Sequence, residues 1–251
     1  SPFIIPDVWK ASVGGSVYLN GTSDYISMAD STDFDFGTGS FSIEAWVYPV
    51  ATANNYPTFL GSVTGWSAGA SSHRFDNTGQ AGKFSVHKYP DDPLMSSTST
   101  FEHDAFYHYV LTRSGDTWRM MINGVLEDVI THTGSYDLSN GSGGIRVGNS
   151  SWDGANGYYK GNVADVRIIK GSIPTAYQTS STTEGATIFT PPTAPTALDS
   201  DTKLKLDFTQ AGIFDSAAIN DLRLYGDAQE STTQKKYATT SMKFDGTGDY
   251  I

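Results

Sequence analysis

The chain has 251 residues, 38% of them hydrophobic and 13% aromatic, so it can bury a sizeable core as one large domain or two smaller ones. No stretch is apolar for long enough to cross a membrane as a helix, and no signal peptide is recognisable at the first residues. The net charge of −11 and the lack of a basic patch argue against nucleic-acid binding. The absence of cysteine excludes disulfides and thiolate metal sites.

One phrase of eleven residues occurs twice, 225 residues apart. Residues 16–26 read SVYLNGTSDYI and residues 241–251 read SMKFDGTGDYI, with six identical positions. Self-similarity at a domain-sized period is typical of tandem arrays. The sequence therefore predicts one whole module followed by the front of a second one, with neighbouring repeats of the same chain as partners.

Apolar and polar residues alternate at period two along much of the chain, which predicts short strands and little helix. Asn123 and Gly124 form a two-residue hairpin signal, because a type I′ turn needs positive φ at both positions. Asp91 and Asp92 lie beside prolines and are predicted in a loop. Each copy of the repeated phrase predicts a strand, a Gly-Thr turn and a second strand that opens on Asp-Tyr-Ile. Further strands are predicted at 41–48, 83–87, 106–112, 117–122, 125–131, 144–148, 158–169, 203–208 and 221–225.

Residues 171–200 are rich in Thr, Ser, Pro and Ala, and their prolines favour an extended linker. The sequence therefore predicts a first domain over 1–190, a linker over 191–200 and the truncated start of a second repeat over 201–251. An alternative stays open, because the last fifty residues hold too few strands to close a sandwich alone. They either open a second module or complete the sheet of the first.

Four ordered blocks resemble the laminin-G-like jelly-roll domains of the concanavalin-A-like lectin/glucanase superfamily: residues 16–26, 39–49, 106–124 and 161–169. The repetition and the Thr/Pro-rich segment are similar to tandem arrays in structural and tail proteins of marine bacteriophages. The resemblance implies an all-β fold, a two-sheet antiparallel jelly-roll β-sandwich with loops at both rims, followed by the start of a second similar module.

Glycan-hydrolysing members of that superfamily carry carboxylates at alternate positions of one strand, where two residues face the same cleft. This chain has no such row: Glu44 stands alone on its strand, and Glu127 and Asp128 are adjacent, so they face opposite ways. No Gly-x-Ser-x-Gly elbow is present, and the aromatic-rich strand around His108 favours a structural histidine. The sequence therefore predicts no catalytic residues and no enzyme activity.

Calcium is the one metal that the resemblance implies, as a structural ion where residues 16–26 meet the predicted strand at 161–169. Mapped onto this sequence, the expected ligands are Asn20, Asp24 and Asp165, whose oxygens suit calcium. The alternative is that Asp24 only hydrogen-bonds its own turn, as Asx residues often do.

Aromatic residues in loops beside Asn and Asp predict a glycan site at the rim, because sugars combine contact with a ring face and directional polar bonds. The candidate residues are Trp66, Asn149, Trp152, Asp153 and Asn156. The alternative is that a sandwich exposes a few aromatic residues by chance.

Together these expectations describe a non-catalytic virion structural or adhesion module, of the tail-fibre or capsid-surface type, which presents rim loops to a host-surface glycan or protein. It is expected at a virion surface or outside the cell, as a candidate homo-oligomer without nucleic-acid or membrane partners. Two alternatives stay open: a module of a cellular adhesin, and an ancillary carbohydrate-binding domain of a secreted enzyme.

Overall fold

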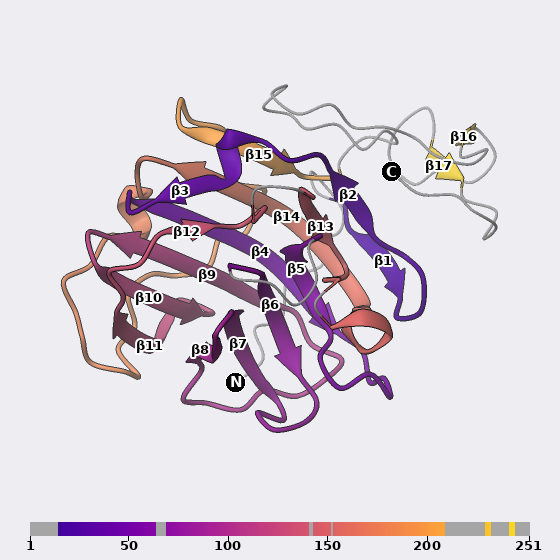
Figure 1. Cartoon of the computed structure of the whole chain (residues 1–251), viewed down its shortest axis with the longest axis horizontal. Helices are drawn as coiled ribbons and strands as arrows, with labels where there is room; N and C mark the ends of the chain where they lie inside the picture. The colour runs from indigo at the N-terminus through magenta and orange to yellow at the C-terminus, as the bar shows by residue number, and fades with distance from the viewer. Residues whose placement is uncertain are drawn as a thin grey trace.

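The computed structural model describes residues 15–63, 69–140, 143–151 and 153–208, together with the backbone of two short strands, β16 (Gln229–Ser231) and β17 (Ser241–Lys243). Two large sheets face each other as a sandwich, as Figure 1 shows. In these described ranges helix is limited to three 3-10 turns, η1 (Thr32–Phe34), η2 (Gly154–Gly157) and η3 (Thr175–Tyr177), and no helix there could span a bilayer. The predicted all-β sandwich is confirmed.

The larger sheet is antiparallel and has seven strands, in the order β1-β14-β4-β9-β10-β11, with β15 also paired to β14. β10 and β11 coincide with two of the predicted strands. The members are β1 (Val17–Asn20), β4 (Phe41–Pro49), β9 (Tyr107–Ser114), β10 (Thr117–Ile122), β11 (Val125–Thr131), β14 (Lys160–Lys170) and β15 (Thr202–Leu206).

The smaller sheet is also antiparallel and has six strands, in the order β2-β13-β5-β6-β7-β8. Its last strand begins at Asp91, so the loop predicted at Asp91 and Asp92 is wrong. The members are β2 (Ile26–Met28), β13 (Ile145–Val147), β5 (Thr58–Ser62), β6 (Ser71–Asp76), β7 (Lys83–Lys88) and β8 (Asp91–Ser96), and a separate pair is formed by β3 (Asp35–Gly37) and β12 (Tyr136–Asp137).

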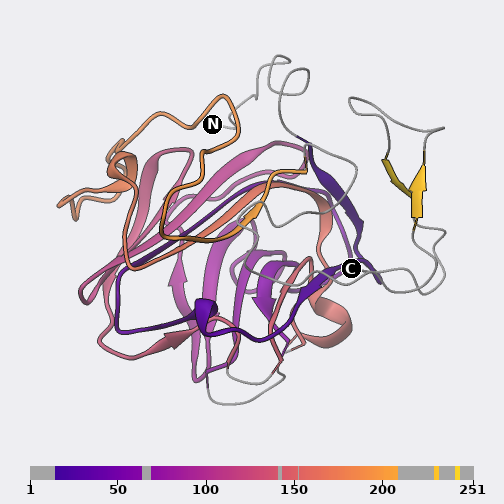
Figure 2. The same cartoon turned by 90° about the horizontal axis from the view of Figure 1, so that it is seen from above.

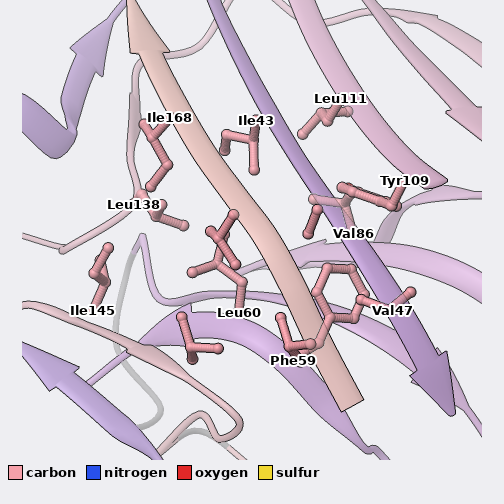
Figure 3. Close-up of a cluster of buried hydrophobic side chains, with 14 of the residues drawn as sticks. Ile43, Val47, Phe59, Leu60, Val86, Tyr109, Leu111, Leu138, Ile145 and Ile168 are labelled. Atoms are coloured by element: carbon pink, nitrogen blue, oxygen red, sulfur yellow. The ribbon is translucent and has the colours of Figure 1, made fainter. Parts of the chain in front are cut away.

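The main core lies between the two sheets, because alternate residues of each strand face the same side. Figure 3 shows Ile43 and Val47 of β4 in this core together with Phe59 of β5. Trp46, on the opposite face of β4, is also fully buried, against Ala164. Both faces of β4 are therefore covered, and Trp46 offers no exposed ring.

Two backbone features shape the strands of the larger sheet. Asn123 and Gly124 have φ values of 52° and 78°, which confirms the predicted hairpin turn between β10 and β11. In β14 the pairing with β4 shifts between Ala164 and Arg167, and Asp165 adopts a φ of 50° there. This β-bulge re-aims the side chain of Asp165 away from the regular alternation.

Residues 171–200, called the covering segment below, pack on the outer face of the larger sheet (orange in Figure 2). Tyr177 of this segment is buried against Val110 and Met121 of the sheet. Apolar contacts with the sheet thus hold the part of the segment around Tyr177 against the sandwich.

The strand at 202–206 bears on the domain boundary. β15 pairs with β14 of the described sandwich, and Leu204 and Leu206 are buried in its main core. This pairing corresponds to the second alternative, in which these residues complete the first sheet. The division into 1–190, 191–200 and 201–251 stays a prediction, because most of residues 209–251 lie outside the described residues; of the repeated phrase only β17 is described.

Candidate functional site

The loop between β13 and β14 is clamped onto the outer face of the smaller sheet by Asp153. The Asp153 carboxylate accepts a hydrogen bond from Arg74 Nη2 of β6 at 2.6 Å and one from Thr58 Oγ1 of β5 at 2.9 Å. The side chains of Arg74 and Asp153 are both 3% exposed. Burial raises the pKa of Asp153, although Arg74 and Thr58 favour the carboxylate. Asp153 therefore fixes the loop.

Polar residues on the outer face of β6 and β7 form a buried hydrogen-bonded row beneath this loop. Arg74 Nε donates to Ser72 Oγ at 2.7 Å. Ser85 Oγ donates to the Asp76 carboxylate and lies 2.8 Å from His87 Nε2. These hydrogen bonds link β6 and β7 beneath the loop, although one oxygen of the Asp76 carboxylate is buried without a partner in the described part of the chain.

Three tyrosines, Tyr25, Tyr56 and Tyr158, lie around the clamped loop and are called the tyrosine rim. The ring centroids of Tyr25 and Tyr158 are 6.4 Å apart. The guanidinium of Arg146 lies 4.2 Å from the Tyr25 ring centroid, and that of Arg74 lies 5.0 Å from the Tyr56 centroid. Tyr56 is 37% exposed, so the rim presents an aromatic surface to solvent.

The predicted glycan residues can be compared with this geometry. Asn149, Asp153 and Asn156 lie together in the clamped loop, whereas Trp66 and Trp152 lie outside the described residues. Asn149 is 2% exposed and accepts a hydrogen bond from Arg146 Nη1 at 3.1 Å. Asn156 is exposed, and its carbonyl accepts a hydrogen bond from Tyr56 N at 3.1 Å.

The tyrosine rim was not predicted as a site. Tyr25 alternates with the buried Ile26, a pattern that indicates an outward ring. Nothing in the local sequence of Tyr56 singles it out, because its position depends on contacts with Arg74 and with the loop near Asn156.

The expected calcium ligands fall into two separate places. Asn20 donates to both oxygens of the Asp24 carboxylate, from its backbone N at 3.0 Å and from Nδ2 at 2.9 Å. These bonds lie within one turn, as expected if Asp24 only stabilises its own turn. Asp165 pairs instead with Lys205 and accepts hydrogen bonds from Thr196.

Asn20 is paired with Lys160 on β14, five residues before Asp165 along that strand, so the structure does not bring Asp165 to Asn20 and Asp24. No cluster of three or more His, Cys, Asp or Glu side chains that could hold a metal ion occurs within the described ranges. Calcium binding by Asn20 and Asp24 stays a prediction.

Glu44 is the centre of a buried cluster on the outer face of the larger sheet. Its carboxylate accepts hydrogen bonds from Arg167 Nε of β14 and from the Tyr177 hydroxyl, and His108 Nε2 lies 3.6 Å from it. Burial alone raises the pKa of Glu44, but the His108 ring and the Arg167 charge outweigh it and lower the pKa from 4.5 to about 2. Glu44 is thus an ionised partner of Arg167 at neutral pH.

A groove of about 610 Å³ opens between β9, β10 and the start of the covering segment, and is called the β10 groove. Arg119 is the only charged residue in its lining. The other lining residues carry hydroxyl, amide or apolar groups: Ser40, Thr112, Ser114, Ser172, Ile173, Tyr177, Gln178, Thr179 and Ser180.

Solved structures with a similar fold come from several bacteria. The chain has a TM-score of 0.57 and 17% identity to a candidate carbohydrate binding protein from Bacteroides ovatus, covering 83% of this chain and 57% of that one. The NanB sialidase from Streptococcus pneumoniae has a TM-score of 0.48 and 15% identity, covering 64% and 26%. Domain 4 of an extracellular arabinanase from Geobacillus stearothermophilus, in complex with arabinotriose, has a TM-score of 0.46 and 16% identity, covering 63% and 71%.

At these identities the likeness shows the fold alone, and the chain spans little more than half of the first structure. No curated protein matches the chain. Residues 20–176, more than half of the chain, match the family model described as the concanavalin A-like lectin/glucanases superfamily, of the laminin G type. The chain belongs to this superfamily.

Proposed function

We propose that this member of the superfamily is a non-catalytic glycan-binding module and that the tyrosine rim contacts the sugar. The observation that carries the proposal is the position of Tyr25, Tyr56 and Tyr158 beside the exposed Asn156, around a loop that Asp153 clamps. Aromatic faces cover the C–H faces of sugars, while amides and hydroxyls bond their hydroxyl groups. Because the loop is held in place, less conformational entropy is lost on binding.

Two buried carboxylates, Glu44 and Asp153, support binding rather than hydrolysis. A glycosidase needs two carboxyl groups about 5–10 Å apart that face one cleft. Glu44 and Asp153 are instead each committed to a buried arginine, Arg167 and Arg74. These pairs act as internal counter-ions, which favours a module without catalysis.

We further propose a virion setting, in which the module belongs to a tail-fibre or capsid-surface protein and presents the rim to host glycans or proteins. The support is the phrase shared by residues 16–26 and 241–251, together with the Pro-rich segment, both similar to marine bacteriophage arrays. Tandem display would convert weak single contacts into strong overall attachment. Recovery of the chain by mass spectrometry from purified virus particles would support this setting.

Other outcomes point to the two alternatives. A secretion or cell-wall anchor signal in the parent protein would favour a cellular adhesin, provided that the chain is not recovered from virus particles. A catalytic domain in the parent protein would favour an ancillary domain of a secreted enzyme.

The glycan-binding role can be tested on a glycan array with the full chain and with Tyr56→Ala. We expect Tyr56→Ala to weaken binding about tenfold, equivalent to about 1.4 kcal/mol, because an exposed ring face is lost. Tyr18→Ala is the matched control, since Tyr18 is 53% exposed but lies on β1 of the larger sheet. If the parent chain binds no glycan on the array, a purely architectural role is favoured. If Tyr56→Ala and Tyr18→Ala bind equally well, the tyrosine rim is not the glycan site.

A further inference from the structure

Arg119 of β10 is a largely buried cation at the wall of the β10 groove. It is paired with Thr112 of β9 on one side and with Val129 of β11 on the other. The residue is 8% exposed, and its Nε donates a hydrogen bond to the carbonyl oxygen of Ser181 at 2.9 Å. This bond fixes the guanidinium against the covering segment.

Arg119 has no carboxylate partner among the residues that the structure describes. Arg74, Arg113 and Arg167, by contrast, each form an ion pair with a carboxylate. Burial lowers the pKa of Arg119, and no acidic side chain offsets that effect. A cation at the wall of a groove without a carboxylate partner in the described residues favours an anion supplied by a ligand.

The terminal nitrogens of Arg119 are available to such an anion. Within the described ranges the hydrogen bond of the side chain is made by Nε, and neither Nη nitrogen is among the unpaired atoms that are sealed from solvent. Because Arg119 lines the groove, we infer that its Nη groups face this space. Their planar fork matches the two oxygens of a carboxylate or sulfate group.

The remaining wall of the groove suits a polyhydroxylated molecule. Six of the lining residues carry aliphatic hydroxyls, and Gln178 adds an amide. Hydroxyl and amide groups both donate and accept hydrogen bonds, as sugar hydroxyls require. The volume of about 610 Å³ lies within the usual size range of small-ligand sites. The lining contains no Asp or Glu, so an anion meets no repulsion at the wall although the whole chain carries a charge of −11.

We propose that the β10 groove is a second binding site, which takes a sugar bearing a carboxylate or a sulfate group, with the anionic group on the Nη nitrogens of Arg119. The groove lies on the outer face of the larger sheet, whereas the tyrosine rim surrounds a loop on the smaller sheet. The second site therefore goes beyond the proposed rim function and does not depend on it.

The first test is a calorimetric or NMR titration of the full chain with glucuronic acid, glucose 6-sulfate, glucose and inorganic sulfate. We expect the two anionic sugars to bind at least about tenfold tighter than glucose, because a charge-assisted bidentate contact is added. Arg119→Gln should remove this preference, and Arg119→Lys should keep only part of it, since lysine has the charge without the fork. Equal affinity for glucuronic acid and glucose would overturn the proposal, and sulfate that binds as tightly as glucose 6-sulfate would overturn its sugar component.

A second pair of variants keeps the test decisive if Arg119→Gln does not fold. Gln178 is exposed at the groove, and Gln178→Glu introduces a carboxylate of nearly the same shape. We expect it to weaken binding of the anionic sugars about tenfold by occupying or repelling their site, with glucose affected little. Gln178→Ala is the control, because it removes the same hydrogen bond to the Ile173 carbonyl without adding charge. If Gln178→Glu still prefers the anionic sugars over glucose, the anion binds elsewhere and the proposal is overturned. Tyr56→Ala should not change this preference, because Tyr56 lies outside the groove.

Discussion

Glu44 holds side chains from three distant parts of the chain together on the larger sheet. His108, Arg167 and Tyr177 all converge on its carboxylate, and Glu44 itself is fully buried. Glu44→Gln keeps the shape but leaves Arg167 buried without a counter-ion. We expect a loss of about 3–5 kcal/mol in the free energy of unfolding, measured by urea titration at neutral pH.

An exposed carboxylate in the turn between β9 and β10 provides the control for Glu44. Asp116 lies 3.6 Å from Arg113, and its side chain is 56% exposed. The same carboxylate-to-amide change, Asp116→Asn, should therefore cost less than about 1 kcal/mol. Similar losses in the two variants would show that burial does not decide the contribution of Glu44.

At the scale of elements, β15 can be tested as a structural strand of this sandwich. Leu204 is fully buried in the main core, and β15 is paired with β14. Leu204→Ala should lower the free energy of unfolding by about 2–5 kcal/mol, because the truncation leaves a cavity. Leu198→Ala makes the same change at a residue that is 49% exposed, and it should have little effect. A negligible loss for Leu204→Ala would argue that β15 belongs to a different module.

The strands of the larger sheet were predictable because one face of each meets the main core. Among the missed strands, β5, β6 and β8 belong to the smaller sheet, and β3 and β12 form the separate pair. In β6 the outward residues Ser72, Arg74 and Asp76 are polar yet buried, and the inward His73 is polar as well. This pattern lacks the apolar alternation on which strand prediction depends. Tertiary hydrogen bonds, not local propensity, stabilise this strand.

The candidate site was predictable only in part, for a similar reason. The composition of residues 149–156 predicted a polar loop, because Asn, Asp and Gly favour turns. Its clamp depends on Arg74 and Thr58, which are 79 and 95 residues away from Asp153 along the chain. Residues 171–200 resemble a linker in composition, yet the isolated Tyr177 packs on the sheet. Long-range contacts of this kind leave no periodic signal in the sequence.

At the scale of the whole molecule, the two outer faces of the sandwich carry different chemistry. The smaller sheet buries a polar row under the loop clamped by Asp153, and the tyrosine rim surrounds that loop. The larger sheet is covered by residues 171–200, which leave the β10 groove at one end. The two proposed sites lie on different sheets and share no residue, so each can be changed by mutation without altering the other.

His73 connects the two halves of the sandwich and should make its stability depend on pH. The ring lies in the smaller sheet, with Nδ1 2.8 Å from the Tyr109 hydroxyl of the larger sheet and Nε2 2.9 Å from the Tyr136 hydroxyl. Burial, with a smaller contribution from the charge of His87, lowers the pKa of His73 from 6.5 to about 3. The unfolded chain therefore takes up the proton first as the pH falls.

The stability contributed by neutral His73 is accordingly complete above pH 6.5 and is lost as the pH falls from 6.5 toward 3. We expect the free energy of unfolding, measured in urea between pH 6 and pH 5, to fall by about 1.4 kcal/mol per pH unit on this account. His73→Gln should flatten that slope, because glutamine can still bond a tyrosine hydroxyl but does not titrate. His103→Gln, a change in the loop before β9, should keep the slope of the parent chain. The stability that ionised Glu44 contributes is lost only below about pH 4.5, outside this pH range. An unchanged slope in His73→Gln would therefore mean that a group other than His73 causes the loss of stability between pH 6 and pH 5.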